Sequence, residues 1–371
     1  MRRVFLLIFL YIILQGFYAG ITTVPKELDS LMYHIPIAKS YLTGDIFSSP
    51  RSPILHRFFP GASEGILALF MLLHLPLNLY NVLGVLSLFF ACYVLGKKAG
   101  LGRDSSLIFA VSFSSLTGVI RWMNVQIVDI WMAVYYAGAL ALLIKPEKNV
   151  RYFLKLGIVT GMILGTKYSG PLYVMMILAV LGKRIKVITV TKSIAFITVI
   201  TILGGFWYLR NFIVTGNPVY PISFLSFPGV KDWALEMPVW RAIFNYPASF
   251  ATAVFSEYLG WSLLGGMVFL KRGSSSLINT LLLLFLGNLL IFLLLPNGSS
   301  YRVHVSNLRY YYPVFLPYLL SIFLIAKERN WGGYLNMFSF ANILFVLQFP
   351  YHPKLLAVYV LLAFFISLRR L

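Results

Sequence analysis

Five ionisable residues of this chain stand in strongly apolar surroundings: Asp29, Asp129, Lys167, Arg210 and Arg309. A charge in or near a bilayer is costly, so such residues are usually paired and often mark a functional site. Once the basic loops fix the orientation of the chain, all five map to one side of the membrane. Their side chains could take up a proton from a reactant and bind an anion.

Asp29 opens a segment in which apolar residues recur at helical spacing. Leu31, Ile35, Ala38 and Leu42 lie on one stripe, which predicts a short amphipathic helix on the membrane surface. As an ionised carboxylate facing a cavity, Asp29 could act as a general base. Since it would stand near the helix start, capping of that helix is the alternative role.

Asp129 falls near the outer end of a predicted helical hairpin, 105–144. The chain turns around residues 121–124, which puts Asp129 about five residues, or roughly 7 Å, along the returning helix. A carboxylate there should point into the bundle toward water or a cation. A structural ion pair with Arg121 is the alternative to a direct role.

Lys167 lies at the tip of a second hairpin, 153–182, which is too short to cross a bilayer twice. Its length as helix is about 45 Å, against about 30 Å for each crossing. The tip, Gly165 to Pro171, therefore stops below the outer surface and leaves Lys167 in a recess near the headgroups. There the lysine either meets an anionic partner or extends to water.

The composition is that of an integral membrane protein. Of 371 residues, 59% are hydrophobic and 11% charged, and the mean hydropathy is +0.83. We predict an all-α, polytopic transmembrane bundle with about 12 crossings, within a range of roughly 11–13, and amphipathic interfacial helices in the first outer loop. The predicted crossings are 4–22, 77–96, 105–120, 125–144, 153–166, 168–182, 193–211, 251–270, 277–296, 309–326, 332–348 and 355–368.

The basic residues set the predicted topology. Most fall in segments that we place in the cytoplasm, namely 1–3, 97–104, 145–155, 183–192, 271–276, 327–330 and 369–371. Both termini are then cytoplasmic, and two long segments, 23–76 and 212–250, face the exterior. Within the first, 62–75 should lie in the outer interface or enter the membrane and return. We take the start as a retained first helix and the chain, 1–371, as one domain of the cytoplasmic membrane.

Several classes of function lack support. The net charge of +20 follows from the positive-inside bias, so no nucleic-acid partner is predicted. A single cysteine allows no internal disulfide, and the five histidines lack metal-ligand spacing. No cofactor or metal is predicted, although a divalent cation between Asp29 and Asp129 stays open. No nucleotide-binding motif appears.

Four blocks of the sequence carry a resemblance to known proteins. They are Asp29–Pro36 with Tyr41–Gly44, Gly165–Gly170, Trp207–Asn211 with Thr215–Pro221, and Arg309–Pro313. In this order they resemble blocks of the GT-C glycosyltransferases, which include protein O-mannosyltransferases and aminoarabinose transferases. Many of those proteins carry a second acid beside the catalytic aspartate, whereas here Ser30 follows Asp29 and the nearest acid is Glu27.

The resemblance implies transfer of a sugar from a polyprenyl-phosphate donor to a lipid or glycan acceptor, on the exterior face and with inversion. Asp29 aligns with the catalytic carboxylate and is expected to be the general base. The other expected site residues are Asp129 and Glu27 as second acidic or structural groups, Lys167, Arg309 and Arg210 at the donor phosphate, and Tyr33, His34, Tyr168 and Tyr310 as substrate contacts. Arg210 could equally cap its helix and bind lipid headgroups.

Two other functions stay open at this point. A polysaccharide polymerase or ligase acting on lipid-diphosphate glycans would depend on a large outer loop more than on Asp29. A transporter of lipid-linked glycans would place its charges near the bilayer midplane, in broken helices of two related halves. No such internal repeat is found in the sequence.

Overall fold

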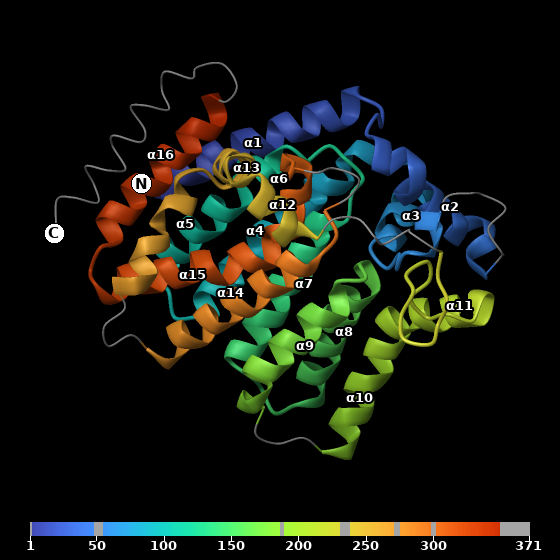
Figure 1. Ribbon diagram of the computed structural model, residues 1–371. Helices are drawn as coiled ribbons and strands as arrows, with labels where there is room; N and C mark the ends of the chain where they lie inside the picture. The colour runs from blue at the N-terminus through green and yellow to red at the C-terminus, as the bar shows by residue number, and fades with distance from the viewer. Residues whose placement is uncertain are drawn as a thin grey trace.

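The computed structural model describes residues 2–47, 55–185, 189–230, 238–270, 275–297 and 302–348. These residues are mainly helical, as predicted, and within them only two isolated bridges stand in for β-structure. The α-helices are α1 (Arg2–Thr22), α2 (Ile35–Thr43), α3 (Glu64–Leu72), α4 (Tyr80–Lys98), α5 (Arg103–Ser114), α6 (Thr117–Ile120), α7 (Asp129–Ile144), α8 (Val150–Thr166), α9 (Gly170–Leu181), α10 (Val190–Ile200), α11 (Phe206–Thr215), α12 (Val239–Asn245), α13 (Pro247–Tyr258), α14 (Ser276–Leu294), α15 (Tyr312–Glu328) and α16 (Gly332–Gln348) (Figure 1).

Five helical stretches are long and apolar enough to cross a bilayer. They are Arg2–Thr22, Leu77–Lys98, Val190–Thr215, Ser276–Leu294 and Val305–Glu328. Shorter apolar helices accompany them, so the chain is an integral membrane protein with a polytopic helical fold. The count of about 12 crossings stays a prediction. The predicted crossing 355–368 lies outside the described residues.

The bundle is organised around α15. This helix packs against α5, α7, α14 and α16 (Figure 1). Its residues from Tyr312 to Ala326 are all buried. By contrast, the stretch Val190–Thr215, which contains α10 and α11, has few buried residues, none of them in α10, and contacts the bundle mainly through α8. A residue just before α15 therefore lies in the middle of the protein. Most of the surface of α10, by contrast, is free to contact lipid.

Several predicted helices end or bend earlier than hydropathy indicates. The stretch 105–120 divides into α5 and α6, because the backbone at Leu116 is extended (φ −61°, ψ 143°). The predicted helix 251–270 is interrupted at Leu259, where φ is +53°. There α13 ends and a 3-10 segment, η7 (Leu259–Leu270), begins. Apolar composition predicts burial in a membrane but not the continuity of a helix.

The segment 23–76, which we predict to be the first outer loop, contains short helices as expected, with a different buried face. A π-helical turn, η1 (Ser30–His34), precedes α2, and the N–H of Ile35 donates to the Ser30 carbonyl. Pro36 lacks an N–H for the normal bond, which favours the wider turn. The added residue changes the angle between Leu31 and the residues of α2. Ile35 and Ala38 are buried in the protein, whereas Leu31 and Leu42 are exposed (50% and 48%), so the predicted stripe is divided between two environments.

The helix 62–75 is shorter than predicted. In the structure α3 covers only Glu64–Leu72 and packs against α2. Nine residues of helix extend about 14 Å, which is half of what a crossing needs. This length fits the expected interfacial or re-entrant placement.

The hairpin with Lys167 at its tip depends on a glycine. A Cβ atom on Gly170 would lie 2.1 Å from the Ile163 carbonyl oxygen of α8. We expect Gly170→Ala to lower the free energy of unfolding by about 1–3 kcal/mol, because backbone atoms have to move. Thermal unfolding in detergent measures this loss. The matched control is Gly182→Ala at the other end of α9, where a Cβ meets nothing within 4 Å.

Candidate active site

Asp29 lies between the end of α1 and the π-helical turn η1. Its backbone is helical (φ −62°, ψ −38°), but its side chain makes no capping hydrogen bond. Glu27 does this instead: its Oε2 accepts hydrogen bonds from the Ser30 backbone N–H (2.7 Å) and the Ser30 hydroxyl (2.9 Å). The capping alternative for Asp29 is therefore wrong. Its carboxylate is 31% exposed and available for other contacts.

Arg309 provides the cation that meets Asp29. It lies in a 3-10 segment, η8 (Val305–Tyr311), directly before α15, and its side chain is only 6% exposed. One guanidinium nitrogen, Nη2, donates to Asp29 Oδ2 and lies 3.3 Å from the Tyr310 hydroxyl. The Nε atom lies 3.4 Å from Oδ2 of Asp129. One buried arginine thus joins two carboxylates that are far apart in the sequence.

Asp129 is the first residue of α7 and is 2% exposed. Its Oδ1 accepts a hydrogen bond from the ammonium group of Lys167. The position favours an anion, because the N-terminus of a helix carries partial positive charge. Arg121, the partner suggested for a structural ion pair, instead pairs with Glu257 at 2.8 Å. Asp129 does form ion pairs, but its partners are Lys167 and Arg309.

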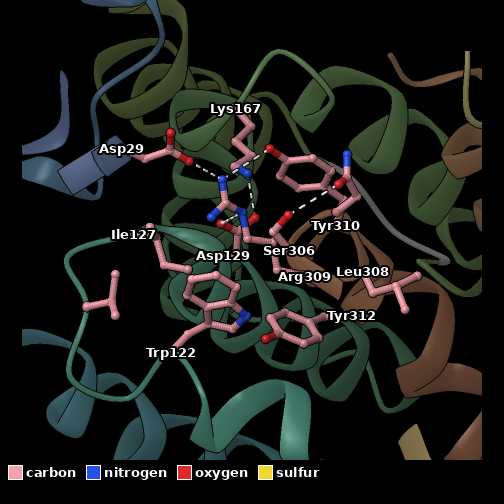
Figure 2. A network of polar contacts seen from close by, with 12 residues as sticks. Asp29, Trp122, Ile127, Asp129, Lys167, Ser306, Leu308, Arg309, Tyr310 and Tyr312 are labelled. Carbon is pink, nitrogen blue, oxygen red and sulfur yellow. Dashed lines mark hydrogen bonds and ion pairs between the residues drawn. The ribbon is translucent and has the colours of Figure 1, made fainter. Parts of the chain in front are cut away.

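Together the four side chains form a row of alternating charge: Asp29, Arg309, Asp129 and Lys167 (Figure 2). Two carboxylates and two cations sum to zero formal charge, which limits the cost of burial. Lys167 is 20% exposed, so the row is most open at its two ends, Asp29 and Lys167. These ends are the parts of the row that an outside molecule can reach.

Aromatic rings enclose the row. The Lys167 nitrogen lies 3.9 Å from the centre of the Tyr310 ring, and the Arg309 guanidinium lies 5.2 Å from the Trp122 ring (Figure 2). Ring faces attract cations without competing for their hydrogen bonds. Tyr310 was an expected substrate contact, whereas Trp122 was not. The position of Trp122 in the turn 121–124, close to Asp129 in the sequence, was the signal that could have identified it.

The loop before α7 is held by a residue that the sequence analysis did not single out. Asn81, fully buried on α4, donates from Nδ2 to the carbonyl oxygens of Val125 (2.7 Å) and Ile127 (2.8 Å). A loop buried beside the site needs such partners for its backbone. The predicted helix 125–144 therefore begins later, at Asp129. An asparagine within an apolar helix was the sequence signal.

Arg210 and Tyr168 belong to a different cluster from the one predicted. Arg210 is buried and donates to Oδ1 of the adjacent Asn211 and to the Phe58 carbonyl (2.9 Å). Asn211 Nδ2 donates to the Tyr168 hydroxyl (2.7 Å), which also contacts the Phe58 and Tyr220 carbonyls. These contacts join the hairpin tip to the two segments predicted as outer loops, 23–76 and 212–250. The contacts of both side chains are thus structural.

Tyr33 and His34 belong to η1, the turn that follows Asp29. The Tyr33 ring stacks on His56 with a centroid distance of 5.0 Å, and burial, with the charges of Tyr310 and Asp29, raises its pKa. His34 Nδ1 lies 2.7 Å from Oε1 of Glu64. Neither side chain takes part in the row of charges. Of the expected substrate contacts, Tyr310 is the one in contact with Arg309 and Lys167.

A cavity of about 420 Å³ opens next to the Asp29 turn. It is lined by Thr23, Val24, Lys26, Glu27, Asn78, Asn124, Val125 and Gln126. Its wall is tied to the site, because the Gln126 backbone N–H donates to the Ser30 hydroxyl (3.1 Å). Within the described part of the chain, no three His, Cys, Asp or Glu side chains lie close enough together to hold a metal ion.

This chain resembles known proteins in its fold but not in its overall sequence. No known protein family matches the sequence, and no curated protein sequence matches it. Solved structures do match it, and they have the GT-C glycosyltransferase fold predicted from the sequence blocks. The predicted resemblance is confirmed at the level of the fold.

The matching structures are those of ArnT from Cupriavidus metallidurans. The structure in the apo state covers 91% of this chain with a TM-score of 0.60 and 15% sequence identity. The structure bound to undecaprenyl phosphate covers 98% with a TM-score of 0.62 and 15% identity. The present chain corresponds to 63% and 69% of those two ArnT chains. At this identity the likeness shows the fold alone.

Proposed function

We propose that this protein is an inverting glycosyltransferase that moves a sugar from a polyprenyl-phosphate donor to a lipid or glycan acceptor. The observation that carries the proposal is the row Asp29–Arg309–Asp129–Lys167, which combines a partly exposed carboxylate with two cations. A related fold binds undecaprenyl phosphate in ArnT, which supports a lipid phosphate as the donor's carrier.

Lys167 and Arg309 bind the donor phosphate in this proposal. As the bond between the anomeric carbon and the phosphate oxygen breaks, the phosphate gains a negative charge, and fixed cations stabilise this charge. Asp129 contacts both cations and fixes their positions relative to each other. These two cations supply the charge stabilisation, so no divalent cation is required. Arg210, buried on a carbonyl and an amide, stays a weaker candidate.

Asp29 acts as the general base. The acceptor hydroxyl gives its proton to the Asp29 carboxylate while its oxygen forms the new bond to the anomeric carbon. The bonding pair of the broken bond leaves with the polyprenyl phosphate. The acceptor attacks opposite the leaving phosphate, so the anomeric configuration inverts. We place the acceptor on the side of the cavity that adjoins Asp29, where Glu27 and Lys26 form part of the wall.

The side of the membrane is also part of the proposal. From the positive-inside bias of the basic segments, we infer that the protein lies in the cytoplasmic membrane with both termini in the cytoplasm. Asp29, Asp129, Lys167 and Arg309 then work on the exterior or periplasmic face. Alkylation of single cysteines, introduced into a chain with Cys92 replaced, measures this orientation.

Transfer by the purified protein in lipid tests the function. We expect turnover with at least one donor of a panel of radiolabelled polyprenyl-phosphate sugars and suitable acceptors. Turnover only with lipid-diphosphate glycans would favour the polymerase or ligase instead. Movement of a labelled lipid-linked glycan across proteoliposomes without any transfer would favour the transporter. The sugar and the acceptor are both read out by this panel.

A further inference from the structure

Glu64 and His34 form a buried pair that the proposed mechanism does not use. His34 Nδ1 lies 2.7 Å from Glu64 Oε1, and the two side chains are 3% and 2% exposed. The second oxygen, Glu64 Oε2, has no hydrogen-bond partner among the described residues. A fully buried carboxyl group with one free oxygen is expensive in its charged form. It therefore needs an explanation beyond packing.

This pair links the two ends of the row of charges. His34 lies on η1, the turn that begins directly after Asp29. Glu64 opens α3, and the residue before it, Ser63, lies 2.8 Å from Thr166 through their hydroxyl oxygens. The Ala62 N–H also donates to the Gly165 carbonyl (2.7 Å). The start of α3 is thus fixed to the hairpin tip, whose next residue is Lys167.

We propose that Glu64 is a positioning residue for sugar transfer, because its bond to His34 sets the place of the Asp29 turn relative to Lys167. The inference rests on the proposed function. Its physical basis is that base and phosphate-binding cation lie on separate segments, and both must meet one donor. A misplacement of about 1 Å between such groups costs roughly 100-fold in rate.

The protonation of the pair supports this role. Burial raises the pKa of Glu64 to about 8, and burial lowers the pKa of His34. Near neutral pH the pair is then uncharged as a whole. As the pH rises through about 8, the pair gains a buried negative charge. Oε2 has no hydrogen-bond partner among the described residues to stabilise this charge. The charged and titratable side chains facing Glu64 are His34, Lys167, Asp129, Arg210, Tyr41, Tyr80 and Tyr135.

The sign of the pH effect follows from this arrangement. The extra negative charge attracts Lys167 and opposes an anionic donor, so donor binding weakens as the pH rises through about 8. Because the pKa of Glu64 is raised in the folded state, its protonated form also stabilises the fold below the unfolded pKa. That stabilisation declines as the pH rises towards the folded value.

Two substitutions of Glu64 test the proposal with an active donor. Glu64→Leu removes the hydrogen bond, and we expect kcat to fall at least tenfold. Glu64→Gln keeps a hydrogen-bonding group but cannot titrate. We expect it to recover most of kcat and to lose the alkaline rise in donor KM, roughly three- to tenfold in the wild type between about pH 7 and pH 9. Glu147→Gln, an exposed acid elsewhere, is the matched control.

Unchanged kcat in Glu64→Leu, or an alkaline rise in KM that persists in Glu64→Gln, would overturn the positioning role. Infrared spectroscopy adds a readout independent of turnover. A protonated carboxyl band that titrates near pH 8 and disappears in Glu64→Gln is expected. If the wild type transfers no sugar from any donor, the proposed function fails. If it transfers sugar but these variants behave like the wild type, only the present inference fails.

Discussion

Asp29→Asn abolishes sugar transfer while donor binding survives. The amide has nearly the size of the carboxylate but cannot take a proton, so we expect kcat to fall by roughly 10²–10⁴-fold. Asp29 also competes with the donor phosphate for Arg309, to which it is hydrogen-bonded. Removing its charge should therefore leave binding of undecaprenyl phosphate as tight as before, or tighter. Turnover and equilibrium binding, measured on the same preparation, separate the two effects.

The matched control for this prediction is Asp45→Asn. Asp45 lies in the same outer loop and is exposed, but it is outside the row of charges. We expect it to keep wild-type turnover. Unchanged turnover in Asp29→Asn would remove Asp29 from the mechanism. A parallel loss of turnover and donor binding would instead make Asp29 a part of the donor site.

Arg309→Gln is expected to have the second large effect, on both stability and donor binding. Arg309 is 6% exposed and contacts two carboxylates, so its loss leaves Asp29 without its cation and Asp129 with Lys167 alone. Breaking a buried pair in this way costs about 3–5 kcal/mol. The row then carries a net negative charge. Binding of undecaprenyl phosphate should weaken at least tenfold, by roughly 1.4 kcal/mol or more.

Two further variants make this result specific. Arg309→Lys keeps the charge but lacks the planar group that reaches two carboxylates at once, so partial recovery is expected. Arg302→Gln removes an exposed arginine that lies over the Tyr246 ring (5.0 Å), outside the row of charges, and should leave binding unchanged. Binding that is unaffected in a folded Arg309→Gln protein would assign the phosphate to Lys167 and other groups.

Much of the site could be predicted because its signals are local in the sequence. Each of Asp29, Asp129, Lys167 and Arg309 is a charge within an apolar or interfacial stretch, and such charges are rare enough to stand out. The short hairpin around Lys167 followed from length alone, and helices α8 and α9 end and begin on either side of it. The helical class followed from composition in the same way.

Other features have no local signal. Glu64 appeared as one more acid of an outer loop, and only the packing of α3 against η1 and the hairpin tip brings it to His34. Arg210 looked like a fifth member of the site, but the fold directs it to the Phe58 carbonyl. The predicted stripe from Leu31 to Leu42 took no account of the π-helical turn, which changes the helical phase between Leu31 and α2.

The sequence by itself determined the helical membrane class, the short hairpin and which charged residues stand in apolar stretches. These depend on hydrophobicity and on the cost of charge, which adjacent residues express. The tertiary structure decided the partners: Arg309 reaches Asp29 and Asp129, and Arg121 goes to Glu257. Asp29 and Arg309 are 280 residues apart in the chain. Their contact arises from the way α15 enters the centre of the bundle, which no local pattern encodes.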